Sequence, residues 1–133
     1  MTLESIRQKI FATLATSWAT ATPVAWPNQR FEPPAQGEWI RPVIKIPITT
    51  VGELGDDGVG LRDGLLMISV FGRSDTGSSR ASQLADRLEA IFRRKDIDNL
   101  WLDEPSSNPQ GNDPNGFYHI LMTVDFHCWV GET

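Results

Sequence analysis

The chain has 133 residues, of which 40% are hydrophobic and 22% charged, the balance of an ordinary soluble globular protein. This length corresponds to a single domain over residues 1–133 that buries about two-thirds of its unfolded surface. The formal net charge of −5 argues against nucleic acid as the main partner, because phosphate binding requires a concentrated basic face. The single cysteine, Cys128, excludes an intrachain disulfide and is typical of a reducing cytosol.

The N-terminal residues are predicted to form an amphipathic helix and no secretory signal. Apolar residues recur there at spacings of three and four, with Thr2 as the N-cap: Leu3, Ile6, Ile10 and Leu14. Acidic and polar groups among the first residues do not fit a signal peptide. No apolar run approaches the roughly 18 residues that a membrane span requires, so we expect no membrane contact.

Two extended segments are predicted next, the short run 22–26 and the longer segment 38–48. The longer one alternates, with Ile40, Ile44, Ile46 and Ile48 on one face and Trp39, Arg41, Val43 and Lys45 on the other. Pro42 and Pro47 cannot donate to a ladder, so this strand is expected to be an edge or bulged. An edge is also a natural place for a neighbouring subunit to attach.

A glycine-rich segment over 49–64 predicts either a long hairpin or a mobile arm. Its glycines are Gly52, Gly55, Gly58, Gly60 and Gly64. Because it offers little apolar surface to bury, we expect it to serve assembly more than folding. The acids Asp56, Asp57 and Asp63 lack the spacing of an EF-hand, which favours a solvated loop over a cation site. The run 65–71, apolar on both faces, predicts a central strand.

The remainder of the chain predicts one more helix and two more strands. Residues 81–92 form the clearest helix, capped by Ser78 or Ser79, with an ion pair between Glu89 and Arg93 on its outer side. A short strand is predicted at 99–102, a polar loop at 103–116, and a long alternating strand at 117–130. The core-facing side of that last strand carries Cys128, an inert small hydrophobe there.

These elements predict an α+β fold in the order α-β-β-β-α-β-β. Two helices would pack on one face of a mainly antiparallel sheet, from which the glycine-rich arm extends. No internal repeat and no interdomain linker interrupts the pattern.

The segment 72–79 is the main candidate for chemistry, because it lies between a strand and a helix, where phosphate-binding loops occur. Its glycine spacing matches a P-loop, but Ser78 stands where that loop requires lysine, and Asp75 would repel phosphate. A nucleophile elbow is also excluded, because the second glycine comes one residue too late. We interpret the segment as a tight turn with serine caps.

The two histidines, His119 and His127, point to the same side of the last predicted strand. At about 3.3 Å per residue they are roughly 26 Å apart and cannot share a metal ion. Asp125 and His127 could form an acid–base pair or two ligands, although a solvated or interface face is the stronger interpretation. The sequence therefore predicts no active site, no cofactor and no metal site.

The chain carries, in this order, an N-terminal helix leading to Trp18, the run 22–28, Phe31, the run 38–41, the run 62–71, Gly77, the helix 81–92 and Phe117–Tyr118. The order and spacing of these stretches resemble the phage tail terminator-like family, the small tail-completion proteins of long-tailed bacteriophages. The resemblance covers nearly the whole chain, and its specificity lies in the joint pattern.

The resemblance implies a structural role without enzyme activity. Members form rings, usually hexameric, that bind the growing end of the tail tube, stop its polymerisation and present a surface to head-completion proteins. We therefore expect the partners to be copies of the chain itself, the tail tube protein and a head-completion protein. The expected location is the virion tail at the head–tail junction, after assembly in the host cytoplasm. The pattern suggests these interface residues: Trp39, Arg41, Lys45, Glu53, Asp56, Asp57, Arg62 and Asp63.

Two other functions compete with this interpretation. A head–tail connector or tail tube subunit would have a similar shape, and the formation of a closed ring would distinguish the terminator from both. A small cytosolic enzyme with an unrecognised site at 72–79 is the remote alternative, and nucleotides in a thermal shift assay would reveal it.

Overall fold

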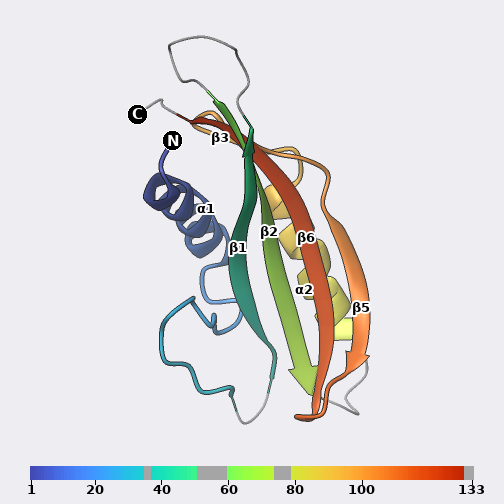
Figure 1. The fold of residues 1–133 in the computed structure, drawn as a ribbon. Helices are drawn as coiled ribbons and strands as arrows, with labels where there is room; N and C mark the ends of the chain where they lie inside the picture. Colours follow the sequence, from blue (N-terminus) through green and yellow to red (C-terminus); the bar gives the residue numbers. More distant parts are fainter. Residues whose placement is uncertain (35–36, 51–59, 74–78, 131–133) are drawn as a thin grey trace.

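A computed structural model of the chain describes residues 1–34, 37–50, 60–73 and 79–130. Its elements are α1 (Leu3–Trp18), β1 (Trp39–Thr50), β2 (Gly60–Arg73), α2 (Ser79–Phe92), β3 (Asp96–Ile97), β4 (Leu100–Leu102), β5 (Ser106–Asn112) and β6 (Phe117–Val130). All pairs of these strands are antiparallel, and both helices lie on one side of the sheet (Figure 1). The predicted α+β class, with two helices on one face of a mainly antiparallel sheet, is confirmed.

The helix α1 begins at its predicted cap, Thr2. The Thr2 hydroxyl accepts a hydrogen bond from the Ser5 amide at 3.1 Å, and the Ser5 hydroxyl accepts one from the Thr2 amide at 2.9 Å. One stripe of the helix has no exposed surface: Ile6, Ile10, Leu14 and Trp18. At the buried end, the Trp18 indole N–H donates to the Thr22 hydroxyl at 3.0 Å, which satisfies its polar group inside the core.

Three long strands form the body of the sheet, in the order β1-β2-β6. Along its other edge, β6 pairs with β4 near one end and with β5 along the rest, and β3 completes the sheet beyond β4. The strand β1 is an edge strand, and its register shifts between Lys45 and Ile48, where Pro47 lies. Both properties were expected from the prolines of this segment.

The number and order of strands differ from the prediction in three places, one of which is the unpredicted two-residue strand β3 after α2. The run 22–26 forms an isolated parallel bridge between Val24 and Ile40 and no strand. The stretch 103–116, predicted as a loop, contains β5. Its polar sequence has no strand pattern; the strand forms because β6 offers a free row of backbone groups that require partners. The order is therefore α-β-β-α-β-β-β-β.

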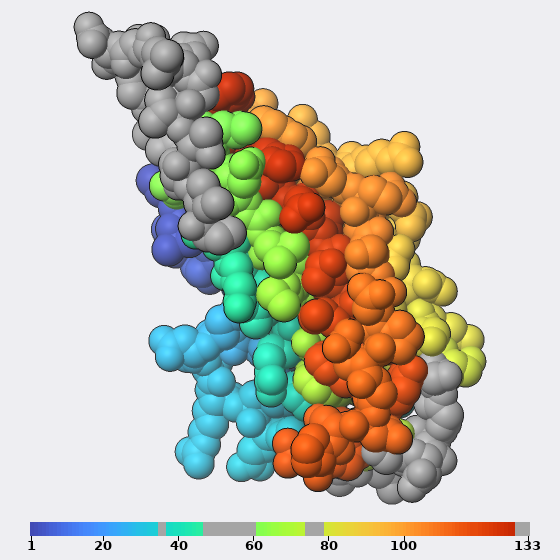
Figure 2. Space-filling view, turned by 45° about the vertical axis from the view of Figure 1, so that its right-hand side comes forward, coloured from blue at the N-terminus to red at the C-terminus, as the bar shows by residue number. Residues whose placement is uncertain are grey.

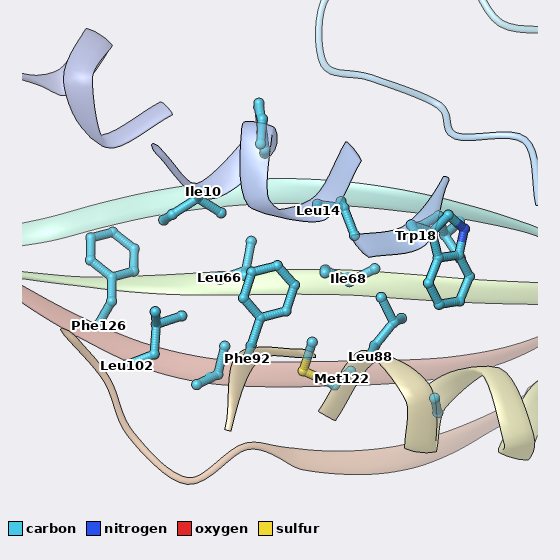
Figure 3. Close-up of a cluster of buried hydrophobic side chains, with 14 of the residues drawn as sticks. Ile10, Leu14, Trp18, Leu66, Ile68, Leu88, Phe92, Leu102, Met122 and Phe126 are labelled. Carbon is cyan, nitrogen blue, oxygen red and sulfur yellow. The ribbon is translucent and has the colours of Figure 1, made fainter. Parts of the chain in front are cut away.

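The core lies between the sheet and the two helices (Figure 3). Every second residue of the long strands points into it, and these side chains are almost fully buried: Ile40, Leu66, Ile68, Val70, Ile120, Met122, Val124, Phe126 and Cys128. The second helix contributes Leu84, Leu88 and Phe92, each at most 1% exposed. The Cys128 thiol is free and buried, and burial raises its pKa, as expected for an inert side chain. No helix in the described ranges is long and apolar enough to cross a membrane.

The glycine-rich segment is flanked by a hairpin ladder. β1 extends to Thr50 and β2 begins at Gly60, with Thr49 opposite Arg62; residues 51–59 lie outside the described part of the chain. Gly64 belongs to the folded sheet, because a Cβ at this position would lie 2.1 Å from Cζ of the Phe126 ring. The last glycine of the segment therefore allows the backbone of β2 to lie close against the Phe126 ring.

Candidate interaction surface

In the described part of the chain no helix covers the face of the sheet turned away from α1 and α2, although Ala25 and Phe31 pack against the aromatic residues at one end of it. We call it the open face; it consists of Trp39, Arg41, Val43 and Lys45 of β1, Leu61, Asp63, Leu65, Met67, Ser69 and Phe71 of β2, and Phe117, His119, Leu121, Thr123, Asp125, His127 and Trp129 of β6. In Figure 2 the strands β1, β2, β6 and β5 lie side by side on this surface. Its side chains come from alternate positions because strand residues point to opposite faces in turn.

One end of the open face is an aromatic cluster. The Trp39 and Phe71 rings stack with centroids 4.2 Å apart, and His119 stacks on the other side of Phe71 at 4.6 Å. The Arg41 guanidinium lies over Trp39 and Phe71, 5.2 and 5.3 Å from their centroids. Phe117 packs edge-on against both Trp39 and Phe71. This end is therefore a second small core, closed by a cation.

The middle of the open face is half-buried and apolar, with charges at its sides. Val43 of β1 lies opposite Met67, and Lys45 lies opposite Leu65. Lys45 on β1 and Asp125 on β6 are both exposed. Apolar side chains without a covering layer, next to exposed charges, are typical of a surface that contacts another protein.

The opposite end of the open face holds His127 between two carboxylates. Its Nδ1 lies 2.6 Å from Oδ1 of Asp63 on β2, and its Nε2 lies 2.7 Å from Oδ2 of Asp103 after β4. The Trp101 ring packs against the imidazole with centroids 5.7 Å apart. Burial lowers the pKa of His127, but the hydrogen bonds to Asp63 and Asp103 and their charges outweigh it, so the pKa is raised overall.

The pKa values of the two histidines of the open face are shifted in opposite directions. Burial lowers the pKa of His119, the charge of Asp113 opposes this, and Arg41 lowers the pKa further. His127 does not form a metal site with its carboxylates, since they occupy opposite ring nitrogens. Within the described ranges no group of three or more His, Cys, Asp or Glu side chains is arranged to hold a metal ion.

The family profile described as phage tail terminator protein matches residues 5–109. The chain belongs to the phage tail terminator protein family. The match runs from α1 through most of β5, and it makes the chain a structural protein of the phage tail, a role that implies no catalysis.

A solved structure supports the fold of this tail terminator family member. It superposes with a TM-score of 0.71, covers 96% of this chain and 95% of its own length, and is 24% identical in sequence. At this identity the likeness concerns the fold alone. No curated protein sequence matches the chain.

The tail terminator chain brings some of the predicted interface residues together. Arg41 and Lys45 are exposed on β1 and point to the open face together with Trp39. Trp39 is 2% exposed and packs within the aromatic cluster, so its contribution to an external contact is indirect. Asp63 lies on the same face, bound to His127.

Other predicted interface residues lie elsewhere. Arg62 points to the helix-covered side, where its guanidinium donates to the Met1 carbonyl at 3.4 Å. Glu53, Asp56 and Asp57 fall outside the described residues, as do residues 74–78 of the P-loop-like segment.

Sequence reasoning missed two members of the His127 cluster. It considered Asp125, the neighbour along β6, whereas the carboxylates come from Asp63 across the sheet and Asp103 beyond β4. Asp125 is exposed and its carbonyl accepts from the Asp103 amide at 2.9 Å, which positions Asp103. The sequence contained one indication of the role of Asp63, because the alternating pattern of β2 places this carboxylate among apolar residues.

In the described part of the terminator chain, three hollows of the surface lie beside α1. One, of about 480 Å³, is lined by Met1, Thr2, Ser5, Lys9, Asp98, Asn99 and Trp129. Lys9 and Asp98 cross it as an ion pair at 3.5 Å. Such an arrangement holds two surface elements together and sets no nucleophile beside a base.

Proposed function

We propose that this chain caps the growing end of the phage tail tube as a ring of identical subunits, stops tube polymerisation and presents the joining surface for the head. The observation that carries the proposal is the family match over residues 5–109. The ring is expected to be a hexamer, in contact with the tail tube protein below and a head-completion protein above. The subunits act in the virion at the head–tail junction, after assembly in the host cytoplasm.

The open face supports this proposal by supplying a contact surface. A closed ring needs two different patches on each subunit, because every copy meets its neighbours head to tail. The apolar middle of the open face and the cations Arg41 and Lys45 beside it form one such patch. Both cations are exposed, and within the described residues neither forms an ion pair, so both are available to a partner's acidic groups.

The test is complementation of a phage or prophage that lacks this gene. Wild-type protein should restore tails of one length with a ring at the tube end, seen by electron microscopy. The double variant Arg41→Ala/Lys45→Ala should give tubes of uncontrolled length or headless tails while folding normally.

The matched control is Arg7→Ala/Lys95→Ala, which removes two exposed cations on the helix-covered side, one on α1 and one beside it. It should complement like wild type. Normal tails from the gene deletion itself would overturn the proposed function. Normal tails from the Arg41 and Lys45 variant alone would overturn only the assignment of the patch.

A further inference from the structure

The open edges of the sheet are blocked against strand addition. A strand at a sheet edge exposes unpaired amide and carbonyl groups, which readily pair with a strand of another chain. We infer that copies of this chain and its tail partners join it through side-chain surfaces and not by extending its sheet. In the described part of the chain the open edges are β1, β5 and β3, and each carries its own obstacle.

On β1 the obstacle is Pro42. Both backbone groups of Ile40 point away from β2, because its amide donates to the Pro23 carbonyl at 3.2 Å and its carbonyl accepts from the Ala25 amide at 2.8 Å. Backbone groups alternate in direction along a strand, so Pro42 occupies the next outward position, where it presents no donor. The register shift between Lys45 and Ile48 then ends the regular outward row after Ile44.

On β5 the obstacle is Pro109, which also lacks an amide hydrogen. The carbonyl of Asp125 accepts from the Asp103 amide, which shows that the odd-numbered residues of β6 bond toward β4 and β5. Asn108, opposite Leu121, therefore bonds inward, and Pro109, opposite Ile120, lies in the outward row. A register shift between Pro109 and Gly111 follows at once.

Few outward donors remain. On β1 the amide of Ile44 is the one left between Pro42 and the register shift. Before its register shift, β5 retains the outward amide of Ser107, whose hydroxyl donates to the Glu89 carboxylate of α2. The third edge, β3, has two residues, Asp96 and Ile97. Such a short edge is itself a recognised protection against strand pairing.

This arrangement suits a subunit that must stop polymerisation. Strand addition between β1 of one copy and β5 of the next would continue without limit unless the geometry happened to close. The two edges lie at opposite sides of the surface in Figure 2, so an unblocked sheet could extend at both ends. A proline in the outward row costs the subunit no internal hydrogen bond and removes this route.

The first experiment restores the missing donors with Pro42→Val/Pro109→Thr. Each restored hydrogen bond should strengthen self-association by about tenfold. The double variant should therefore form larger species in concentration-dependent light scattering, with a gain of intermolecular sheet in infrared spectra. Wild type and the control Pro27→Val/Pro114→Thr, whose prolines lie outside the strands, should not.

Folding is checked by thermal unfolding, and Pro109→Thr alone serves if the buried Pro42 site does not tolerate valine. A folded variant with the association state of wild type at all concentrations would overturn the inference. This measurement uses purified protein, so its outcome is separate from that of the proposed role in tails.

The second experiment removes the outward donor of β5. Ser107→Pro deletes both the hydroxyl and the amide hydrogen, whereas Ser107→Ala deletes the hydroxyl alone. If partners join through side chains, the two variants should complement tail assembly equally. Failure of Ser107→Pro beside a functional Ser107→Ala, with both proteins folded, would show that strand pairing at this edge is required.

Discussion

The two faces of the sheet are made from the same three strands and yet serve different purposes. On the covered face, Leu66, Ile68 and Val70 of β2 have no exposed surface, because α1 and α2 pack over them. On the open face, Leu65 and Met67 of the same strand are half-buried, although their side chains are as apolar as those of the covered face. The hydrophobicity of a central strand therefore does not determine which of its two faces a helix will cover.

The open face is also divided within itself. Its aromatic end is closed by stacking and by Arg41, and its other end by the His127 cluster, whereas the middle has apolar side chains without a described cover. A face that is fixed at both ends and apolar between them is suited to contact a partner without rearrangement.

The largest difference between the faces should appear at two adjacent residues of β2. Ile68→Ala removes a fully buried side chain and should lower the free energy of unfolding by about 2–5 kcal/mol. Met67→Ala removes a half-buried one and should cost about 1 kcal/mol. Urea unfolding of both variants measures the contrast, and equal losses would mean that the open face is as well packed as the core.

The close approach of Gly64 to Phe126 gives the next largest effect. Gly64→Ala places a methyl group against the ring and should destabilise the fold by about 1–3 kcal/mol. In Gly64→Ala/Phe126→Leu the smaller side chain relieves the clash, so Phe126→Leu should cost less in the Gly64→Ala background than in wild type. Additive losses in this double-mutant cycle would contradict the steric explanation.

The contributions of His127 and His119 to the stability of the protein should depend on pH with opposite signs. The pKa of His127 is raised, so its stabilisation is present below the unfolded value of about 6.5 and is lost as the pH rises through the folded value. The pKa of His119 is lowered, so its contribution is present above about 6.5 and is lost as the pH falls.

His127→Gln should therefore lower the unfolding free energy by about 1 kcal/mol near pH 6 and by less near pH 8.5. His119→Gln should show the reverse trend. Urea midpoints of both variants and wild type between pH 5.5 and 8.5 provide the measurement. Parallel curves for the two variants would refute the assigned partners.

The smallest effect on stability is expected at the exposed cations of β1. Lys45→Ala should change the unfolding free energy by less than about 0.5 kcal/mol, and Arg41→Ala by about 0.5–1 kcal/mol because of its contact with the rings. A large loss of stability in either variant would place the side chain in the folding core and remove it from the interaction surface.

Several features followed from the sequence by itself. The periodicity of Ile6, Ile10 and Leu14, the cap at Thr2 and the alternation of β1 and β6 are local patterns, and local patterns decide helix and strand as well as the buried side. The ion pair of Glu89 and Arg93, at 3.0 Å, depends on helical spacing alone. The family resemblance was visible for the same reason, since it rests on the order and spacing of such patterns.

Other features were decided only by the tertiary structure. The polar strand β5 forms because β6 has unpaired backbone groups, a requirement that no side-chain pattern records. Trp39 was predicted as an interface residue from its strand pattern, but it is 2% exposed and packs inside the chain. The partners of His127 come from 64 and 24 residues away, so they were out of reach of spacing arguments along one strand. Contacts between distant segments depend on the register of paired strands, and that register is set by packing of the whole sheet against its helices.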